Sequence, residues 1–285
     1  MKNIQEYIEN KNKELKDLFK KTLSVSKLNE YLKEPFDEIT MAENCYQKGL
    51  KDPTYKYAGM NVNEILTQWH DKANESKHYG RLLDEYTDLL FNKKDNDLEL
   101  WKLNNNFNND NRLNNYCKGI EQFIDFIILN TNYYYVGREI PIFYENKNGD
   151  KINGRLDFLL YDDNTDSYII IDWKTTENIT IKNNYNKHLL GPAYMLDECD
   201  MNLYTIQLHV YKKSLVETYR LAPYSRISVY VCNLLREPEN GKYYKLFPQN
   251  FEFNNNRINA FINYGNLQLK LSRICKNEEK ETVNE

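Results

Sequence analysis

Two short runs of β-branched and aromatic residues, separated by an acidic turn, constrain the fold of this chain most strongly. The first run covers residues 154–161 and the second covers residues 168–175. Residues 162–167 between them are Asp, Asn, Thr and Ser, which favour turns. The pattern predicts a β-hairpin with a loop of about five residues.

The register of this hairpin brings two carboxylates together. Residues that face one another in an antiparallel pair have numbers with a constant total, and a turn centred at Asn164 and Thr165 makes that total 329. Asp157 is therefore expected opposite Asp172, with Cα atoms about 4.5–5.5 Å apart. Lys174 shares the face of Asp172 because side chains alternate along a strand. Two opposed carboxylates need a compensating cation; Mg²⁺ or Mn²⁺ suits their oxygens, and a lysine can stabilise a developing anion.

The residues around the acidic pair are apolar on both faces of the hairpin. Leu159 and Ile170 share the acidic face, and the other face carries Leu156, Phe158, Leu160, Ile169, Ile171 and Trp173. Strands that are apolar on both faces are central in a sheet, with layers packed on each side. This places the carboxylates at the end of a buried face, in a cleft. The alternative is a solvated hairpin in which the Asp and Lys residues have no chemical role.

Composition limits the class of protein. A chain of 285 residues is long enough for one large domain or two small ones, and a net charge of −4 excludes nucleic-acid binding through overall positive charge. The 38 Lys and Arg residues still suffice for a local basic groove. Five separate cysteines predict reduced thiols. No apolar run suggests a signal peptide or a membrane span, which predicts a cytoplasmic protein without membrane contact.

Three short motifs follow one another in order along the chain. Gly-x-x-Asp covers residues 154–157, Asp-x-Lys covers 172–174, and Gln-x-x-x-Tyr covers 207–211. The chain thereby resembles the PD-(D/E)XK nuclease superfamily, and in particular its RecB-like exonuclease branch. The resemblance implies an α/β fold with a restriction-endonuclease-like core, in which helices flank a mixed central sheet, and with helical additions at both ends.

The resemblance also implies roles for the hairpin residues. Asp157, Asp172 and Lys174 would be catalytic. Asp157, Asp172 and the backbone carbonyl of Trp173 would hold one or two Mg²⁺ or Mn²⁺ ions, which lower the pKa of bound water and neutralise the scissile phosphate. Lys174 would orient the water or stabilise the transition state.

Further residues are implied as contacts to the substrate. Gln207 and Tyr211 lie one helical turn apart; Gln207 could bind a phosphate or orient a ligand, and Tyr211 could stack on the substrate or hold its backbone. Arg155 is a third candidate. The resemblance implies a DNA exonuclease of recombination, repair or phage replication, which acts on free ends and has a recombination or replication partner protein. A structure-specific endonuclease and an inactive DNA-binding or assembly subunit remain alternatives.

A third metal ligand is expected on the first core helix, predicted over residues 61–92. Related nucleases carry a His or an acidic residue there after a glycine. Gly80 matches the glycine, but Asp84 stands at the position of the His, and His78 lies upstream. Asp84 is the preferred candidate because Mg²⁺ prefers oxygen. His78, Glu85 or no ligand at all are the alternatives.

The ends of the chain complete the prediction. Residues 1–60 are expected as an N-terminal helical extension with Ser26 as a helix N-cap, 61–275 as the nuclease domain, and 276–285 as a disordered tail. The segment before Pro35 resembles that of RecB-like nucleases with an iron–sulfur cluster, but Glu34 stands where those have Cys. We therefore expect no such cluster. Glu139 is either an accessory ligand or an ion-pair partner of Arg138 or Arg155.

Overall fold

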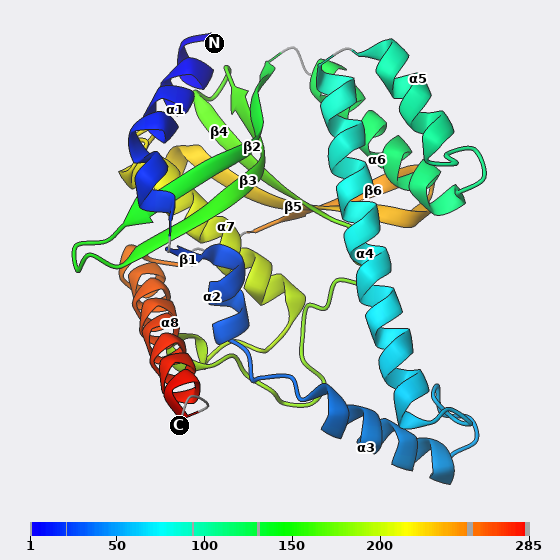
Figure 1. The fold of residues 1–285 in the computed structure, drawn as a ribbon. Helices are drawn as coiled ribbons and strands as arrows, with labels where there is room; N and C mark the ends of the chain where they lie inside the picture. Colours follow the sequence, from blue (N-terminus) through cyan, green and yellow to red (C-terminus); the bar gives the residue numbers. More distant parts are fainter. Residues whose placement is uncertain (1, 21, 93, 130–131, 250–252, 283–285) are drawn as a thin grey trace. The chain divides into compact units, whose positions relative to one another are not determined.

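The computed structural model describes residues 2–20, 22–92, 94–129, 132–249 and 253–282. Its ribbon is drawn in Figure 1. The chain divides into two compact units, each made of segments that are distant in the sequence. Unit 1 comprises residues 1–34, 123–233 and 244–285, and unit 2 comprises 35–122 and 234–243. The division between the units therefore differs from the predicted boundary at residue 60. Residues 1–34 belong to unit 1, and residues 35–60 belong to unit 2.

A mixed sheet of six strands runs through the fold. Its strands are β1 (Leu23–Ser24), β2 (Tyr133–Glu145), β3 (Lys151–Asp162), β4 (Ser167–Lys174), β5 (Ile227–Glu239) and β6 (Lys242–Pro248). The order is β1-β3-β4-β5-β6, with β2 also paired to β3. β3 is antiparallel to β2 and β4, whereas the β1–β3 and β4–β5 pairs are parallel. Helices flank this sheet, so the predicted architecture is confirmed.

The predicted hairpin is formed by β3 and β4 in the predicted register. Phe158 pairs with Ile171 and Leu159 with Ile170, which keeps the total of 329. Leu159 and Ile170 are fully buried in the core that also contains apolar residues of the helix α7 (Asp200–Glu217). On the other face, the Phe123 ring contacts the rings of Phe158 and Trp173, with centroids 5.9 and 5.0 Å away. The hairpin is thus covered on both faces, as its apolar pattern predicts.

Unit 1 also contains helices α1 (Lys2–Leu15), α2 (Val25–Tyr31), α7 and α8 (Asn255–Thr282), the last part of α6 (Asn111–Leu129) and short 3-10 turns. The cap of α2 is Ser24, whose side chain accepts a hydrogen bond from the Lys27 N–H, so the prediction of Ser26 is wrong by two residues. Helix α8 extends through 276–282, where a disordered tail was predicted. This stretch contains Lys and Glu, which favour helices, and lacks Gly and Pro. Residues 283–285 lie outside the described residues.

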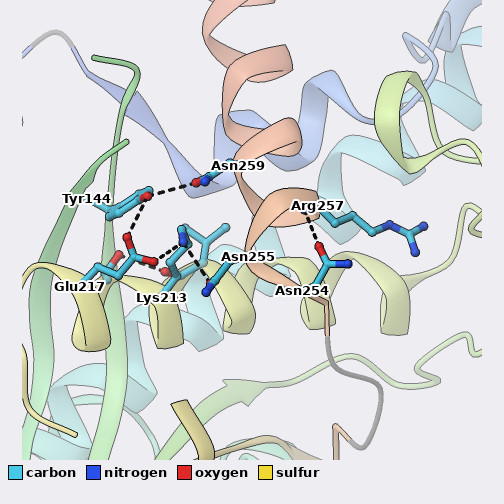
Figure 2. A network of polar contacts seen from close by, with 9 residues as sticks. Tyr144, Lys213, Glu217, Asn254, Asn255, Arg257 and Asn259 are labelled. Atoms are coloured by element: carbon cyan, nitrogen blue, oxygen red, sulfur yellow. Dashed lines mark hydrogen bonds and ion pairs between the residues drawn. The ribbon is translucent and has the colours of Figure 1, made fainter. Parts of the chain in front are cut away.

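A buried polar network ties α7 to its neighbours (Figure 2). The Lys213 side chain is 1% exposed, and its ammonium forms an ion pair with Glu217 and donates a hydrogen bond of 3.1 Å to Asn255. The Tyr144 hydroxyl on β2 donates to Glu217 at 3.2 Å and lies 3.0 Å from the side-chain amide of Asn259 on α8. Because a buried charge is stable only when it is paired and hydrogen-bonded, this network fixes α7 between β2 and α8.

Unit 2 is mainly helical. It contains α3 (Glu38–Lys51), α4 (Val62–Phe91), α5 (Asp95–Asn104) and the first part of α6 (Asn111–Leu129). The long helix α4 matches its prediction and begins with a capping box, in which Asn61 and Glu64 exchange side-chain and backbone hydrogen bonds. In the described part of the chain, no helix combines the length and apolar character needed to cross a membrane.

Candidate active site

The site begins at a break in the edge of β3. Strand β2 pairs along one whole edge of β3, so β1 and β4 must share the other edge. β1 pairs with 152–153 and β4 with 158–162. Residues 154–157 between them have no strand partner on that edge in the described pairings. The Gly-x-x-Asp motif therefore lies at the break between β1 and β4 on this edge of β3.

The two carboxylates lie where the ladder between β3 and β4 stops. Asp157 and Asp172 follow the last pair, Phe158 with Ile171, in the same register. In place of a further backbone bond, the Trp173 N–H donates to Asp157 Oδ2 at 2.8 Å. Lys174 Nζ lies 2.5 Å from Asp172 Oδ2, with 20% of the lysine side chain and 1% of the aspartate side chain exposed. Strand alternation thus brings the predicted trio together.

These charges perturb one another. Burial and the negative charge of Asp172 raise the pKa of Asp157 well above its ordinary value, although Lys174 and the Trp173 N–H oppose this. Burial lowers the pKa of the Lys174 ammonium, but the charges of Asp172 and Asp157 outweigh it, and the resulting pKa is raised. The site therefore holds more negative charge than one ammonium relieves, which is the electrostatic condition for binding a further cation.

Helix α7 holds Asp172 from the opposite side. Gln207 Nε2 donates to Asp172 Oδ1 at 2.8 Å and to the Tyr211 hydroxyl at 3.1 Å. Tyr211 is 4% exposed, and its ring packs over Gly154 so closely that a Cβ there would lie 2.7 Å from Tyr211 Cε1. The glycine of the first motif is therefore required by the tyrosine of the third, and the two motifs form one packed unit around the second.

The donor set fits a magnesium or manganese ion. Asp172 Oδ2 is buried, and the Lys174 ammonium lies 2.5 Å from it. Because the N–H and C=O of a strand residue point to the same side, the Trp173 carbonyl faces the side on which its N–H meets Asp157. Two carboxylates and a carbonyl, completed by water, suit Mg²⁺, which keeps several waters. Among the described residues, no three His, Cys, Asp or Glu side chains gather in a metal-binding group.

Glu139 and Arg155 lie beside the trio. Glu139 falls between the pairs formed by Arg138 and Ile140 with β3, at the position opposite Asp157, and has φ of 49°. This left-handed conformation is uncommon for a residue with a side chain. The Arg155 guanidinium donates to Glu139 Oε2 at 3.2 Å, which agrees with the predicted ion-pair role of Glu139. Arg155 is exposed, and its contact to a substrate remains a prediction.

The candidates for a third ligand lie on α4, in unit 2. Asp84 is exposed, and His78 Nδ1 lies 3.5 Å from Arg81. Glu85 is engaged by its own unit: it accepts from Arg81 at 2.9 Å and from the Trp101 indole at 3.1 Å. The assignment of Asp84 or His78 as a metal ligand stays a prediction.

Sequence reasoning missed one residue of the site, Tyr204. The Lys174 ammonium lies 4.8 Å from the centre of the Tyr204 ring, and the Tyr204 hydroxyl lies 3.3 Å from Thr176 Oγ1. The ring thus holds the lysine by a cation–π contact. Its position three residues before Gln207, on the same face of α7, was the available signal.

Comparisons with known proteins give limited similarity. No protein-family model and no curated protein matches the sequence. The solved structure of a proposed exonuclease from Eubacterium rectale is similar with a TM-score of 0.43 and 16% identity, over 86% of this chain and 85% of that chain. The structure of SSO0001 is similar with a TM-score of 0.30 and 13% identity, over 73% of this chain and 86% of that chain. Such low similarity identifies no activity for this chain.

Proposed function

We propose that this protein is a divalent-metal-dependent nuclease of the PD-(D/E)XK superfamily, in its RecB-like branch, and that it hydrolyses phosphodiester bonds in DNA. The observation that carries the proposal is the convergence of Asp157, Asp172 and Lys174 at the end of the hairpin. Gln207 from α7 supports it by fixing one oxygen of Asp172. A buried acidic pair beside a lysine is costly to a fold, so its presence calls for a chemical role.

In this proposal the two carboxylates and the Trp173 carbonyl hold Mg²⁺ or Mn²⁺. When bound, the ion would acidify a coordinated water and neutralise charge on the scissile phosphate. Asp172 is oriented for this role because Gln207 fixes its Oδ1 while its Oδ2 faces the Lys174 ammonium. Asp157 is oriented by the Trp173 N–H.

Lys174 would supply positive charge on the substrate side. Its ammonium compensates Asp172 in the absence of a metal, and the Tyr204 ring keeps the side chain in place. When a metal ion compensates the carboxylates, the ammonium becomes available to orient the attacking water or to stabilise charge on the phosphate in the transition state. A lysine that remains charged throughout the neutral pH range is suited to this role.

We further propose an exonuclease that acts on DNA ends in recombination, repair or phage replication, together with a partner protein. The test is cleavage of end-labelled DNA by the wild type and by Lys174→Ala, with Mg²⁺ or EDTA. We expect metal-dependent cleavage that falls by at least about 100-fold in the variant, the usual size of such an electrostatic contribution. Asp125→Ala is a matched control, because Asp125 is an exposed residue of α6 outside the site. Cleavage by Lys174→Ala at the wild-type rate would refute the role of Lys174.

A further inference from the structure

The segment between β4 and α7 exposes several large apolar side chains. Ile181, Tyr185, Tyr194 and Met195 are 65%, 85%, 64% and 69% exposed. We call residues 181–195 the tyrosine loop. Single exposed apolar residues are ordinary on a protein surface, whereas several in one short segment make that segment a candidate binding surface.

The first half of this loop is held by a defined set of hydrogen bonds. Asn183 Oδ1 accepts from the Tyr185 N–H at 2.7 Å, and Asn183 Nδ2 donates to the Glu198 carbonyl at 2.8 Å. The Glu198 N–H in turn donates to the Lys187 carbonyl at 2.9 Å. The backbone of Tyr185 is therefore fixed while its ring faces solvent.

The second half of the loop is anchored to the core of unit 1. The Leu190 N–H donates to the Leu32 carbonyl at 2.7 Å. Gly191 has φ of 58° and approaches α8 so closely that a Cβ would lie 2.6 Å from the Tyr264 ring. Ala193 is fully buried, directly before the exposed Tyr194. The outward direction of Tyr194 thus follows from a packed turn, so its exposure is built into the fold.

The loop starts near the proposed catalytic lysine. The Thr180 N–H and hydroxyl donate to Asp200 Oδ2 at 3.0 and 2.8 Å. Asp200 begins α7 one turn before Tyr204, a rise of about 6 Å, and the Tyr204 ring centre lies 4.8 Å from Lys174 Nζ. Thr180, the residue before the loop, is therefore held about one helical turn of α7 away from Tyr204. A nucleic-acid strand whose phosphate lies at Lys174 would have its neighbouring nucleotides within reach of the loop.

We propose that the tyrosine loop is a platform on which bases of single-stranded DNA stack, next to the scissile phosphate. This inference rests on the proposed nuclease function and adds to it the class of substrate, a strand with unpaired bases at its end. Tyrosine rings stack on any base, and unpaired bases are the ones that offer their faces. In a duplex these faces are covered by neighbouring base pairs.

The residues between the apolar side chains favour a nucleic acid over a protein as the occupant. Lys182 is exposed, exposed Lys187 forms an ion pair of 3.5 Å with Glu34, and exposed Asn184 and Asn186 flank Tyr185. Lysine can compensate phosphate charge, and asparagine can donate to phosphate oxygens. A surface that docks a protein has an apolar centre depleted in lysine.

The test measures DNA binding separately from cleavage. Anisotropy of a fluorescent oligothymidylate and of a blunt duplex is recorded in EDTA for the wild type and for Tyr185→Ala, Tyr194→Ala and their double variant. We expect each alanine variant to bind the single strand at least about fivefold more weakly, the lower end of a base–tyrosine stacking contribution, with little change for the duplex. Tyr185→Phe and Tyr194→Phe should bind as the wild type does. Leu103→Ala, which removes a 78% exposed apolar side chain of α5, is the matched control.

Two results would overturn the platform. If the double alanine variant binds the single strand as tightly as the wild type, the loop does not bind DNA, and a protein would be the next candidate for its partner. Binding of the single strand by Tyr185→Leu and Tyr194→Leu at the wild-type affinity would show that non-specific apolar contact, and not base stacking, holds the strand. The nuclease proposal is judged separately from metal-dependent cleavage by the wild type. Tyrosine-dependent binding without any cleavage would uphold the platform and refute the nuclease, whereas cleavage with tyrosine-independent binding would do the reverse.

Discussion

Replacing Lys174 by methionine isolates the charge balance of the site. The change keeps the apolar stem of the side chain and removes the ammonium that lies 2.5 Å from Asp172 Oδ2. Asp172 then keeps a hydrogen bond from Gln207 on its other oxygen but has no cation, although its side chain is 1% exposed. Removing one partner of a buried ion pair costs about 3–5 kcal/mol.

The expected loss of stability lies at or below the lower end of that range. Lys174 is 20% exposed, so water reaches the edge of the site, and the Gln207 hydrogen bond remains. We therefore expect Lys174→Met to lower the free energy of unfolding in EDTA by about 2–3 kcal/mol. For a chain of 285 residues, that corresponds to a melting temperature lower by about 3–5 °C.

The assay is thermal unfolding of four proteins: the wild type, Lys174→Met, Asp172→Asn and the double variant. In EDTA, the double variant should be more stable than the sum of the single changes predicts, with a coupling of about 1 kcal/mol or more. Saturating Mg²⁺ should restore much of the loss in Lys174→Met, since ligand at 100 times its Kd contributes about 2.7 kcal/mol. Equal melting temperatures of Lys174→Met and wild type in EDTA would refute the electrostatic reasoning.

Three further predictions concern other residues. Gly154→Ala places a Cβ 2.7 Å from the Tyr211 ring, so it should lower the free energy of unfolding in urea by about 1–3 kcal/mol and slow cleavage; an unchanged urea midpoint would contradict the packing. Asp157→Asn removes one of two repelling charges, so it should raise the melting temperature in EDTA and abolish the shift caused by Mg²⁺ in differential scanning fluorimetry. Burial and a hydrogen bond to Asp110 raise the pKa of Tyr79 to about 12. Because the neutral phenol is favoured in the folded state, its contribution to the free energy of unfolding is complete below pH 10 and is lost as the pH rises towards 12. Urea unfolding measured between pH 10 and 12 should therefore show a smaller decrease in the free energy of unfolding for Tyr79→Phe than for the wild type.

The hairpin could be predicted from the sequence because its determinants are local. The turn and the alternating strands fix which residues face one another, and Phe158 with Ile171 obeys the predicted register. The trio at its end follows from the same alternation. The helix α4 was predictable for a similar reason, since its apolar period and its Asn61 cap lie within one continuous segment.

Other features depend on contacts between distant segments. Residues 1–34 belong to unit 1, which contains the parallel pairing of Leu23 with Ile152, and no local pattern announces such a pairing. The role of Tyr204 arises from its contact with Lys174 across the fold. The cap of α2 could be assigned to Ser24 or Ser26 from residue type alone, because both serines precede the helical pattern.

The most direct test of the metal-dependent nuclease is a mixture of end-labelled linear DNA and covalently closed circular DNA, incubated with the protein in Mg²⁺, Mn²⁺ or EDTA. Asp172→Ala serves as the inactive control. The proposal predicts metal-dependent loss of the linear DNA, an intact circle, and no loss with EDTA or with the variant. Survival of both substrates in Mg²⁺ and Mn²⁺, or equal loss with Asp172→Ala, would contradict it.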